Sequence, residues 1–100
     1  MSTTERTFRT VGPGVETCIL RKHDGKGITY LVRMQKGASS PAHGHPDGEE
    51  TYIVSGTVRI GGRRLVAGDY LYTPPGESHD GHAEETALFF VIAPGGIVPT

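Results

Sequence analysis

The chain has 100 residues, with ten basic and eleven acidic side chains and one cysteine, Cys18. This length is that of one ordinary domain, so we expect a single domain spanning residues 1–100. The nearly balanced charge, without long runs of either sign, argues against nucleic acid or an anionic membrane as a partner, and one cysteine excludes an internal disulfide and a thiolate metal cluster.

The first 14 residues are polar and end in Gly12-Pro13-Gly14, which predicts a loosely held N-terminal arm. They contain no apolar signal segment, and the longest apolar run, Ala87–Ala93, is too short to span a bilayer. Cys18 is expected to be a small buried side chain, and a lone cysteine fits a reducing compartment. We therefore predict a cytoplasmic protein.

Glycine and proline interrupt the rest of the sequence so often that no stretch offers a long helical period, which is typical of an all-β protein. Ile28–Gln35 alternates in a way that predicts a half-buried strand. Thr51–Ile60 is interrupted by Ser55-Gly56, which indicates either a hairpin or a sharp bend. Arg64–Val66 and Tyr70–Thr73 add further short strands, and this spacing favours a sandwich or a barrel.

Residues 83–93 carry two conflicting signals. The opening Ala83-Glu84-Glu85 favours a helix, whereas Leu88–Ile92 favours a strand buried on both faces. Aromatic and β-branched residues are enriched here, and Pro94-Gly95-Gly96 ends the segment abruptly. We therefore predict a strand from about Thr86.

Three of the five histidines and a carboxylate fall in two short segments, residues 43–49 (HGHPDGE) and 76–79 (GESH). Two histidines separated by one residue on an extended chain point to the same side, because side chains alternate with a period of two. After a turn, Glu49 begins a strand and shares its face with Thr51 and Ile53. A carboxylate at the mouth of that interior requires a cation.

Neutral imidazoles together with a carboxylate suit Fe²⁺, Mn²⁺, Ni²⁺, Zn²⁺ or Cu²⁺. The sequence therefore predicts one divalent transition metal ion bound by His43, His45, Glu49 and His79, with coordination positions left open to water or a substrate. The alternative is that these histidines are ordinary polar loop residues. It is disfavoured because glycines and a Pro-Pro-Gly turn flank them at the spacings that barrel bends require.

The sequence resembles the cupin superfamily. The first cupin motif, G-x5-H-x-H-x3-E-x6-G, is matched at every position by Gly37, His43, His45, Glu49 and Gly56. The second motif, G-x5-P-x-G-x2-H-x3-N, is matched except at its last position, by Gly68, Pro74, Gly76 and His79. Ala83 stands where the family usually has asparagine. The two motifs cover residues 37–83, with the short spacing of compact single-domain cupins.

The resemblance implies a cupin jelly-roll barrel of two packed antiparallel sheets, with a metal inside one end bound by His43, His45, Glu49 and His79. Glu50 is the rival ligand. Glu49 is preferred because its distance to Gly56 fits the motif and because Glu50 would share the opposite face with Tyr52. Small size and the resemblance also predict a homodimer.

Three function classes follow, because cupins host many activities. The first is a dioxygenase in which Fe²⁺, the favoured metal, holds an enolisable or phenolic small molecule, since the sequence resembles small cupins grouped with diketone-cleaving dioxygenases. The second is a Lewis-acid isomerase, lyase or hydrolase, with Glu49, Tyr72 or His82 as candidates for proton transfer. The third is a non-catalytic sensor or binding domain, since the motifs also resemble the cupin domain of certain anti-sigma regulators.

Other candidate residues remain outside the predicted site. His82 is expected in an exposed loop, with a role near the metal as its alternative, and His23 is expected in a solvated turn. Five large side chains are expected either to line a pocket or to fill the core, with core packing favoured, namely Tyr30, Met34, Tyr72, Phe89 and Phe90.

Overall fold

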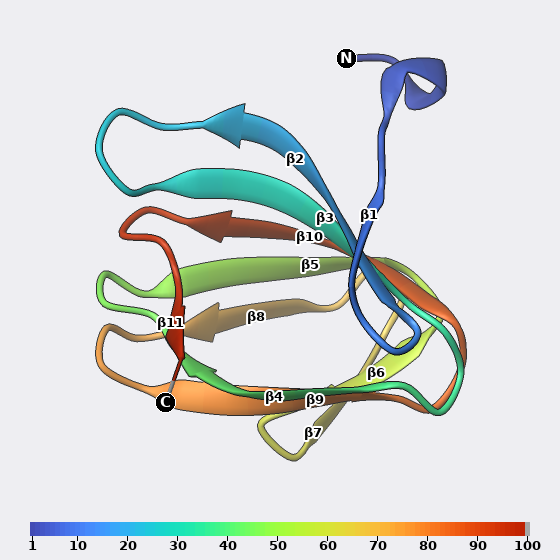
Figure 1. Cartoon of the computed structure of the whole chain (residues 1–100). Helices are drawn as coiled ribbons and strands as arrows, with labels where there is room; N and C mark the ends of the chain where they lie inside the picture. The colour runs from blue at the N-terminus through green and yellow to red at the C-terminus, as the bar shows by residue number, and fades with distance from the viewer. Residues whose placement is uncertain (100) are drawn as a thin grey trace.

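Two antiparallel β-sheets face each other in the computed structural model, which describes residues 1–99 (Figure 1). A short 3-10 turn, η1 (Thr3–Glu5), precedes the strands. In chain order the described strands are β1 (Arg9–Gly12), β2 (Val15–Lys22), β3 (Ile28–Met34), β4 (Ser39–Gly44), β5 (Glu49–Ser55), β6 (Thr57–Ile60), β7 (Arg63–Val66), β8 (Tyr70–Thr73), β9 (Ser78–Ala83), β10 (Ala87–Ala93) and β11 (Val98–Pro99).

The strand order differs from the chain order in both sheets. The six-stranded sheet runs β1-β2-β3-β10-β5-β8, and the five-stranded sheet runs β11-β4-β9-β6-β7. All strand pairs are antiparallel. The predicted all-β jelly roll of two packed antiparallel sheets is confirmed, and the described sheets stay separate rather than closing into one continuous barrel.

The break that the sequence places at Ser55-Gly56 is a bend between the sheets and not a hairpin. β5 belongs to the six-stranded sheet, and β6, which follows immediately, belongs to the other. Gly56 has a φ of 83°, and a Cβ atom there would collide with the backbone of Thr86. Only glycine meets both requirements without strain, so this residue lets the chain change sheets.

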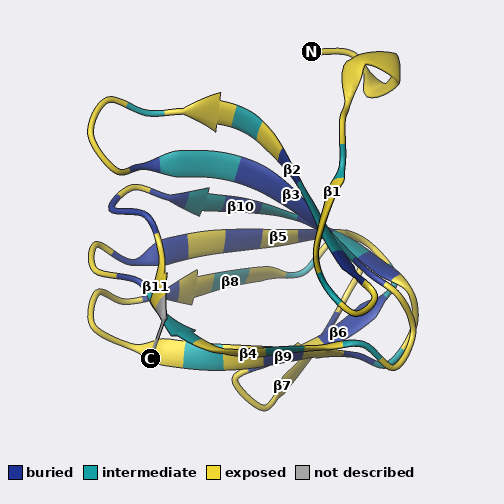
Figure 2. Ribbon diagram, viewed as in Figure 1, coloured by how far each residue is buried: buried dark blue, intermediate teal, exposed yellow. Residues whose placement is uncertain are grey.

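The predicted strand over residues 28–35 is β3, with Met34 fully buried on the inner face. Its outer face is less exposed than predicted, because Leu31 is also buried, beside Cys18 of β2. The predicted strand from Thr86 is β10, whose residues alternate between buried and half-buried (Figure 2). Only its inner face is therefore fully covered.

The core lies between the sheets and is made of inward-facing residues from both of them (Figure 2). Its buried members are Val15, Tyr30, Val32, Met34, Ile53, Val58, Ile60, Leu65, Ala83, Ala87, Phe89 and Val91. Ala83 is fully buried there, and its backbone N–H donates a hydrogen bond to the carbonyl of Ala38. The alanine that replaces the usual cupin asparagine thus packs as core.

The N-terminal segment is partly held by the sheet. Residues 9–12 of the predicted arm form β1 and pair with β2, and the guanidinium carbon of Arg33 lies 3.8 Å from the centroid of the Phe8 ring. Residues 1–7 are exposed. Among residues 1–99, no helix is long and apolar enough to cross a membrane.

Candidate metal centre

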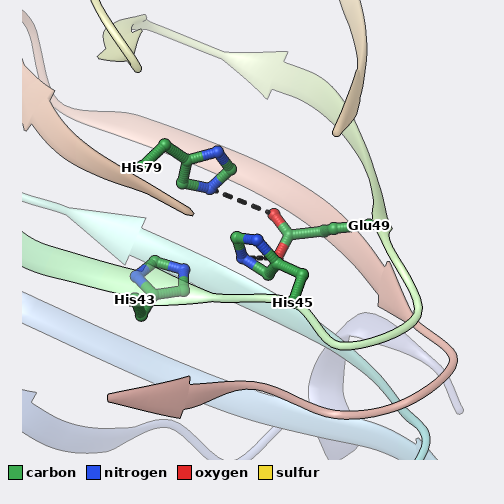
Figure 3. Close-up of side chains that lie close together, drawn as sticks. All are labelled: His43, His45, Glu49 and His79. Atoms are coloured by element: carbon green, nitrogen blue, oxygen red, sulfur yellow. Dashed lines mark ion pairs between the residues drawn. The ribbon is translucent and has the colours of Figure 1, made fainter. Parts of the chain in front are cut away.

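Four side chains from two separate segments of the sequence meet between the two sheets. His43, His45, Glu49 and His79 each offer one ligand atom, and these atoms all lie within 4.8 Å of one another. Figure 3 shows the three imidazoles grouped around the carboxylate. The histidine ring centroids are 4.5–5.1 Å apart. The structure therefore brings together every residue of the predicted ligand set.

Strand pairing explains this convergence. His43 of β4 lies directly opposite His79 of β9 in the five-stranded sheet. His45 is two residues beyond His43, so its side chain returns to the same side. The turn that follows contains Gly48, which has a φ of 83° and would place a Cβ only 2.9 Å from the Thr73 carbonyl oxygen. This tight turn lets Glu49 begin β5 in the facing sheet, opposite the histidines.

Two polar atoms in the cluster are buried without a hydrogen-bond partner among the described residues. They are Nε2 of His45 and Oε2 of Glu49, 2.5 Å apart, in side chains that are 1% and 4% exposed. Oε1 of Glu49 also lies 3.6 Å from Nε2 of His79. A buried carboxylate is costly unless a cation or donors compensate it. A divalent ion coordinated by both atoms would give each of them a partner, so the types of donor present here fit a metal.

Contacts at the other ring nitrogens set the tautomers of two histidines. Nδ1 of His43 lies 3.2 Å from the carbonyl oxygen of Pro41, and Nδ1 of His45 lies 3.3 Å from that of Glu77. A carbonyl oxygen only accepts hydrogen bonds, so Nδ1 is the donor and carries the proton in both rings. The lone pair then resides on Nε2, the atom that faces the cluster, as metal binding requires.

Two threonines complete the surroundings of the cluster. Oγ1 of Thr51 donates a hydrogen bond of 3.0 Å to Oε1 of Glu49, and Oγ1 of Thr73 lies 3.3 Å from Nδ1 of His79. Thr73 is the strand partner of Glu49, so the β5–β8 pairing aligns both ligands. Sequence reasoning missed these contacts, although Thr51 carried a usable signal because it lies two residues from Glu49 on the same strand face.

Burial lowers the pKa of His45 below the ordinary value of 6.5, and the neighbouring imidazoles of His79 and His43 act in the same direction. The charge of Glu49 opposes this shift but is the smaller effect. His45 is therefore held neutral, which is the form that binds metal.

The other candidates lie away from the cluster. Glu50, the rival ligand, is exposed on the outer face of the six-stranded sheet, where its Oε1 accepts a hydrogen bond of 2.8 Å from Tyr70. Tyr72, named as a pocket or proton-transfer candidate, is 53% exposed on that outer face, so this expectation is wrong. Its neighbour Thr73 faces inward instead. His82 is exposed, with its Nδ1 2.7 Å from Oγ of Ser39.

His23 lies in the turn between β2 and β3, as predicted, but it is partly buried rather than solvated, and its side chain contacts β3. Its Nε2 lies 2.7 Å from Oγ1 of Thr29, and its backbone N–H donates to the carbonyl of Gly27. His23 therefore does not contribute to the metal cluster.

A cavity of about 420 Å³ adjoins the cluster between the sheets and has His43, Glu49 and His79 in its wall. Most of the wall is apolar, formed in part by Val15, Tyr30, Val32, Ile60, Phe89 and Val91. Tyr30 and Phe89 belong to the core and also line this pocket. Met34 belongs to the core without lining the pocket, and Phe90 lies half-buried on the outer face. No lysine or arginine lies in the cavity wall within residues 1–99. The site combines a candidate metal with space for a small apolar molecule.

Comparison with known proteins supports this description. Residues 1–94 match the family model described as the ChrR cupin-like domain. The DNA damage-repair/toleration protein DRT102 of Arabidopsis thaliana is 32% identical over 89 residues, which are 83% of this chain and 28% of that protein. The chain thus spans little more than a quarter of this curated relative.

Solved structures show the same fold. A chain in the complex of Rhodobacter sphaeroides SigE with the anti-sigma ChrR is 28% identical, with a TM-score of 0.80, and the match covers 92% of this chain and 51% of that one. A putative acetylacetone dioxygenase from Methylibium petroleiphilum is 16% identical with a TM-score of 0.90, covering 100% of this chain and 78% of that one. With its two-sheet fold and its His/Glu cluster, the chain belongs to the ChrR cupin-like family of cupins.

Proposed function

We propose that the protein is a mononuclear metal-binding cupin in which His43, His45, Glu49 and His79 hold one divalent transition metal ion. The observation that carries this proposal is the pair of buried atoms without hydrogen bonds, Nε2 of His45 and Oε2 of Glu49. A neutral water molecule could donate to these atoms but would leave the buried negative charge uncompensated, whereas a divalent cation attracts both the carboxylate oxygen and the imidazole lone pair and offsets that charge.

The donor set has a clear chemical preference. Three imidazoles and one carboxylate suit Fe²⁺, Zn²⁺, Mn²⁺, Ni²⁺ or Cu²⁺, and Fe²⁺ is the metal we favour. Such an ion would polarise an oxygen atom coordinated to it and would hold two small ligands in adjacent positions. The chain's own residues fix the geometry, because Pro41, Glu77 and Thr51 orient the imidazoles and the carboxylate through hydrogen bonds.

The cavity indicates the class of molecule that meets the metal. Its wall is mainly hydrocarbon, and its charged groups are the acidic Glu49 and Asp80. A polyanion such as a phosphorylated metabolite would be buried there without a protein cation to pair with it. The partner we propose is therefore a small, largely apolar organic molecule.

We further propose that the reaction is of the dioxygenase type, in which both oxygen atoms of O₂ enter the organic substrate. The mainly apolar cavity beside the cluster suits a site where a small molecule and a gas meet. A putative acetylacetone dioxygenase that shares the fold is consistent with this reaction class. The second candidate within enzymes is a Lewis-acid isomerase, lyase or hydrolase at the same metal.

A second candidate function is a non-catalytic metal-binding sensor domain. Two observations favour it. The matching family model is described as the ChrR cupin-like domain, and the chain is 28% identical to a chain in the complex of SigE with the anti-sigma ChrR. In that case the metal would stabilise the fold or report on a bound molecule, and no turnover would be measured.

Metal analysis followed by oxygen uptake separates these functions. Protein purified without chelator is expected to hold one transition metal ion per chain, and the Fe²⁺-loaded form is expected to consume oxygen with an enolisable or phenolic substrate. Tightly held Zn²⁺ without oxygen consumption would favour the Lewis-acid or sensor function. Absence of bound metal after reloading would contradict the proposal as a whole.

We also propose that residues 1–100 form one cupin domain that works as a cytoplasmic homodimer. The outer face of the six-stranded sheet exposes large side chains at Tyr52, Val54 and Tyr70, which a second copy could cover. Light scattering at working concentration is expected to give the mass of two chains. A monomeric mass would contradict the dimer and would leave the metal proposal unaffected.

A further inference from the structure

Tyr30 is a buried tyrosine whose hydroxyl group has no hydrogen-bond partner in the described part of the chain. Its residue is 7% exposed, and its side chain lies in the wall of the cavity beside the metal cluster. Within residues 1–99 its hydroxyl group makes no hydrogen bond, whereas the exposed Tyr70 donates one to Glu50. Among the described residues, the fully buried polar atoms without a partner belong to His45 and Glu49, so the unpaired Tyr30 oxygen keeps some exposure on a side chain that lines the cavity.

The strand register places Tyr30 one row behind the carboxylate ligand. Tyr30 of β3 pairs with Val91 of β10, and Val91 pairs with Thr51 of β5. Thr51 in turn donates the hydrogen bond to Glu49. Tyr30 and Glu49 therefore enter the same space from one inner face, and His43 and His79 enter it from the opposite sheet.

The hydroxyl group is a donor under all ordinary conditions. Burial raises the pKa of Tyr30 far above its usual value, and the nearby charge of Glu49 raises it further. A phenol that stays protonated beside a negative carboxylate keeps its O–H group. That group can donate a hydrogen bond to a third group in the cavity. Two other hydroxyl groups line the cavity, those of Thr17 and Ser40, but both residues are only half-buried.

We propose that the Tyr30 hydroxyl group donates a hydrogen bond to an oxygen atom of the molecule that occupies the cavity. The cavity then selects small apolar molecules whose carbonyl, enolate or phenolate oxygen lies at the metal end. This inference rests on the proposed metal centre, and it assigns to Tyr30 the role of a ligand-binding residue. A ligand without an acceptor atom at this position cannot take the hydrogen bond that Tyr30 donates.

The test uses Tyr30→Phe, which removes one oxygen atom and keeps the ring that lines the cavity. Tyr72→Phe is the matched control, because it removes the same atom from the exposed outer face. Zn²⁺-loaded wild type and both variants are titrated calorimetrically with acetylacetone as the oxygen probe. Metal content and thermal unfolding are measured on the same samples, so that a folding defect is recognised.

Tyr30→Phe is expected to weaken acetylacetone binding about 10-fold, the loss for one hydrogen bond to a charged or polarised acceptor. Its metal content is expected to match that of the wild type, as are all values for Tyr72→Phe. Equal acetylacetone affinity in Tyr30→Phe and wild type would overturn the inference alone, as would a metal-loaded wild type that binds no acetylacetone. A wild type that holds no metal would overturn the proposed function together with it.

Discussion

The interior between the sheets has two ends that are equally buried and chemically opposite. At one end Met34, Val58 and Ala83 pack as hydrocarbon, and each is fully buried. At the other end His45 and Glu49 are buried almost as completely. The strand register separates the ends, because β3 runs from Ile28 at the metal end to Met34 at the hydrocarbon end (Figure 1).

Burial alone therefore does not distinguish core from site. Hydrocarbon side chains gain free energy when they leave water, so the hydrocarbon end is complete without any further group. Buried polar atoms lose hydration and need partners, and two atoms of the metal end have none among the described residues. The incomplete hydrogen bonding of this end, rather than its depth, marks it as the functional one.

Truncation at the hydrocarbon end tests the first half of this comparison. Ile53→Ala removes a fully buried side chain and is expected to lower the free energy of unfolding by about 2–5 kcal/mol in chelator-treated protein. Urea unfolding measures this change, with the exposed neighbour substitution Val54→Ala as a control that should cost less than about 0.5 kcal/mol. Folded Ile53→Ala should retain one metal ion per chain, and loss of metal from the folded variant would contradict the separation of the two ends.

Removal of a ligand tests the second half. His79→Ala is expected to weaken metal affinity by more than about 100-fold, because contacts that only orient a ligand already account for about 10–100-fold. Competition with a chromophoric chelator measures the affinity. His82→Ala is the matched control, since this histidine lies three residues away on the exposed face, and it should bind metal as the wild type does. Equal metal affinity in both variants would refute the role of His79.

A smaller change is expected when a ligand loses only its orienting hydrogen bond. Thr51→Val keeps the shape of the side chain but leaves Oε1 of Glu49 without its donor. Metal affinity should fall by about 10–100-fold, and Thr51→Ser, which keeps the hydroxyl group, should restore most of it. The same competition assay applies. If valine and serine gave the same affinity, the hydrogen bond would have no part in metal binding.

The least effect is expected at the surface, outside both ends. Glu84 accepts hydrogen bonds from Arg59 and Arg64, which hold its pKa below the usual 4.5. Its contribution to stability is present above the unfolded pKa and is lost as the pH falls through the lower folded pKa. Glu84→Gln should therefore reduce the urea midpoint slightly at pH 7, and the difference should vanish in acid or at high salt, with metal content unchanged. A difference that persisted in acid would show that the ion pairs are not its source.

Strands and ligands were predictable where local pattern decides them. Residues 28–34 alternate, residues 87–93 are rich in aromatic and β-branched side chains, and the spacing of the histidines is written directly in the sequence. β1 and β11 carry no such pattern, because they are short and depend on pairing with β2 and β4. Their existence is a tertiary effect that local propensity does not contain.

The burial depth of side chains and the backbone groups that contact the histidines were not predictable, for a related reason. Alternation assigns Tyr30 and Met34 to one face, but it does not say that the first lines a cavity and the second fills the core. The carbonyl groups that orient His43 and His45 belong to Pro41 and Glu77, and a backbone oxygen leaves no trace in residue type. Both features are set by how the two sheets meet.

X-ray absorption spectroscopy of the Zn²⁺-loaded protein tests the central claim most directly, because it reports the atoms around the ion. The four residues predict nitrogen and oxygen neighbours at about 2.0–2.2 Å together with the outer-shell scattering of three imidazole rings. The three rings should fall to two in His79→Ala protein loaded at high metal concentration. A spectrum of oxygen neighbours without imidazole scattering would show that the ion binds elsewhere and would contradict the account.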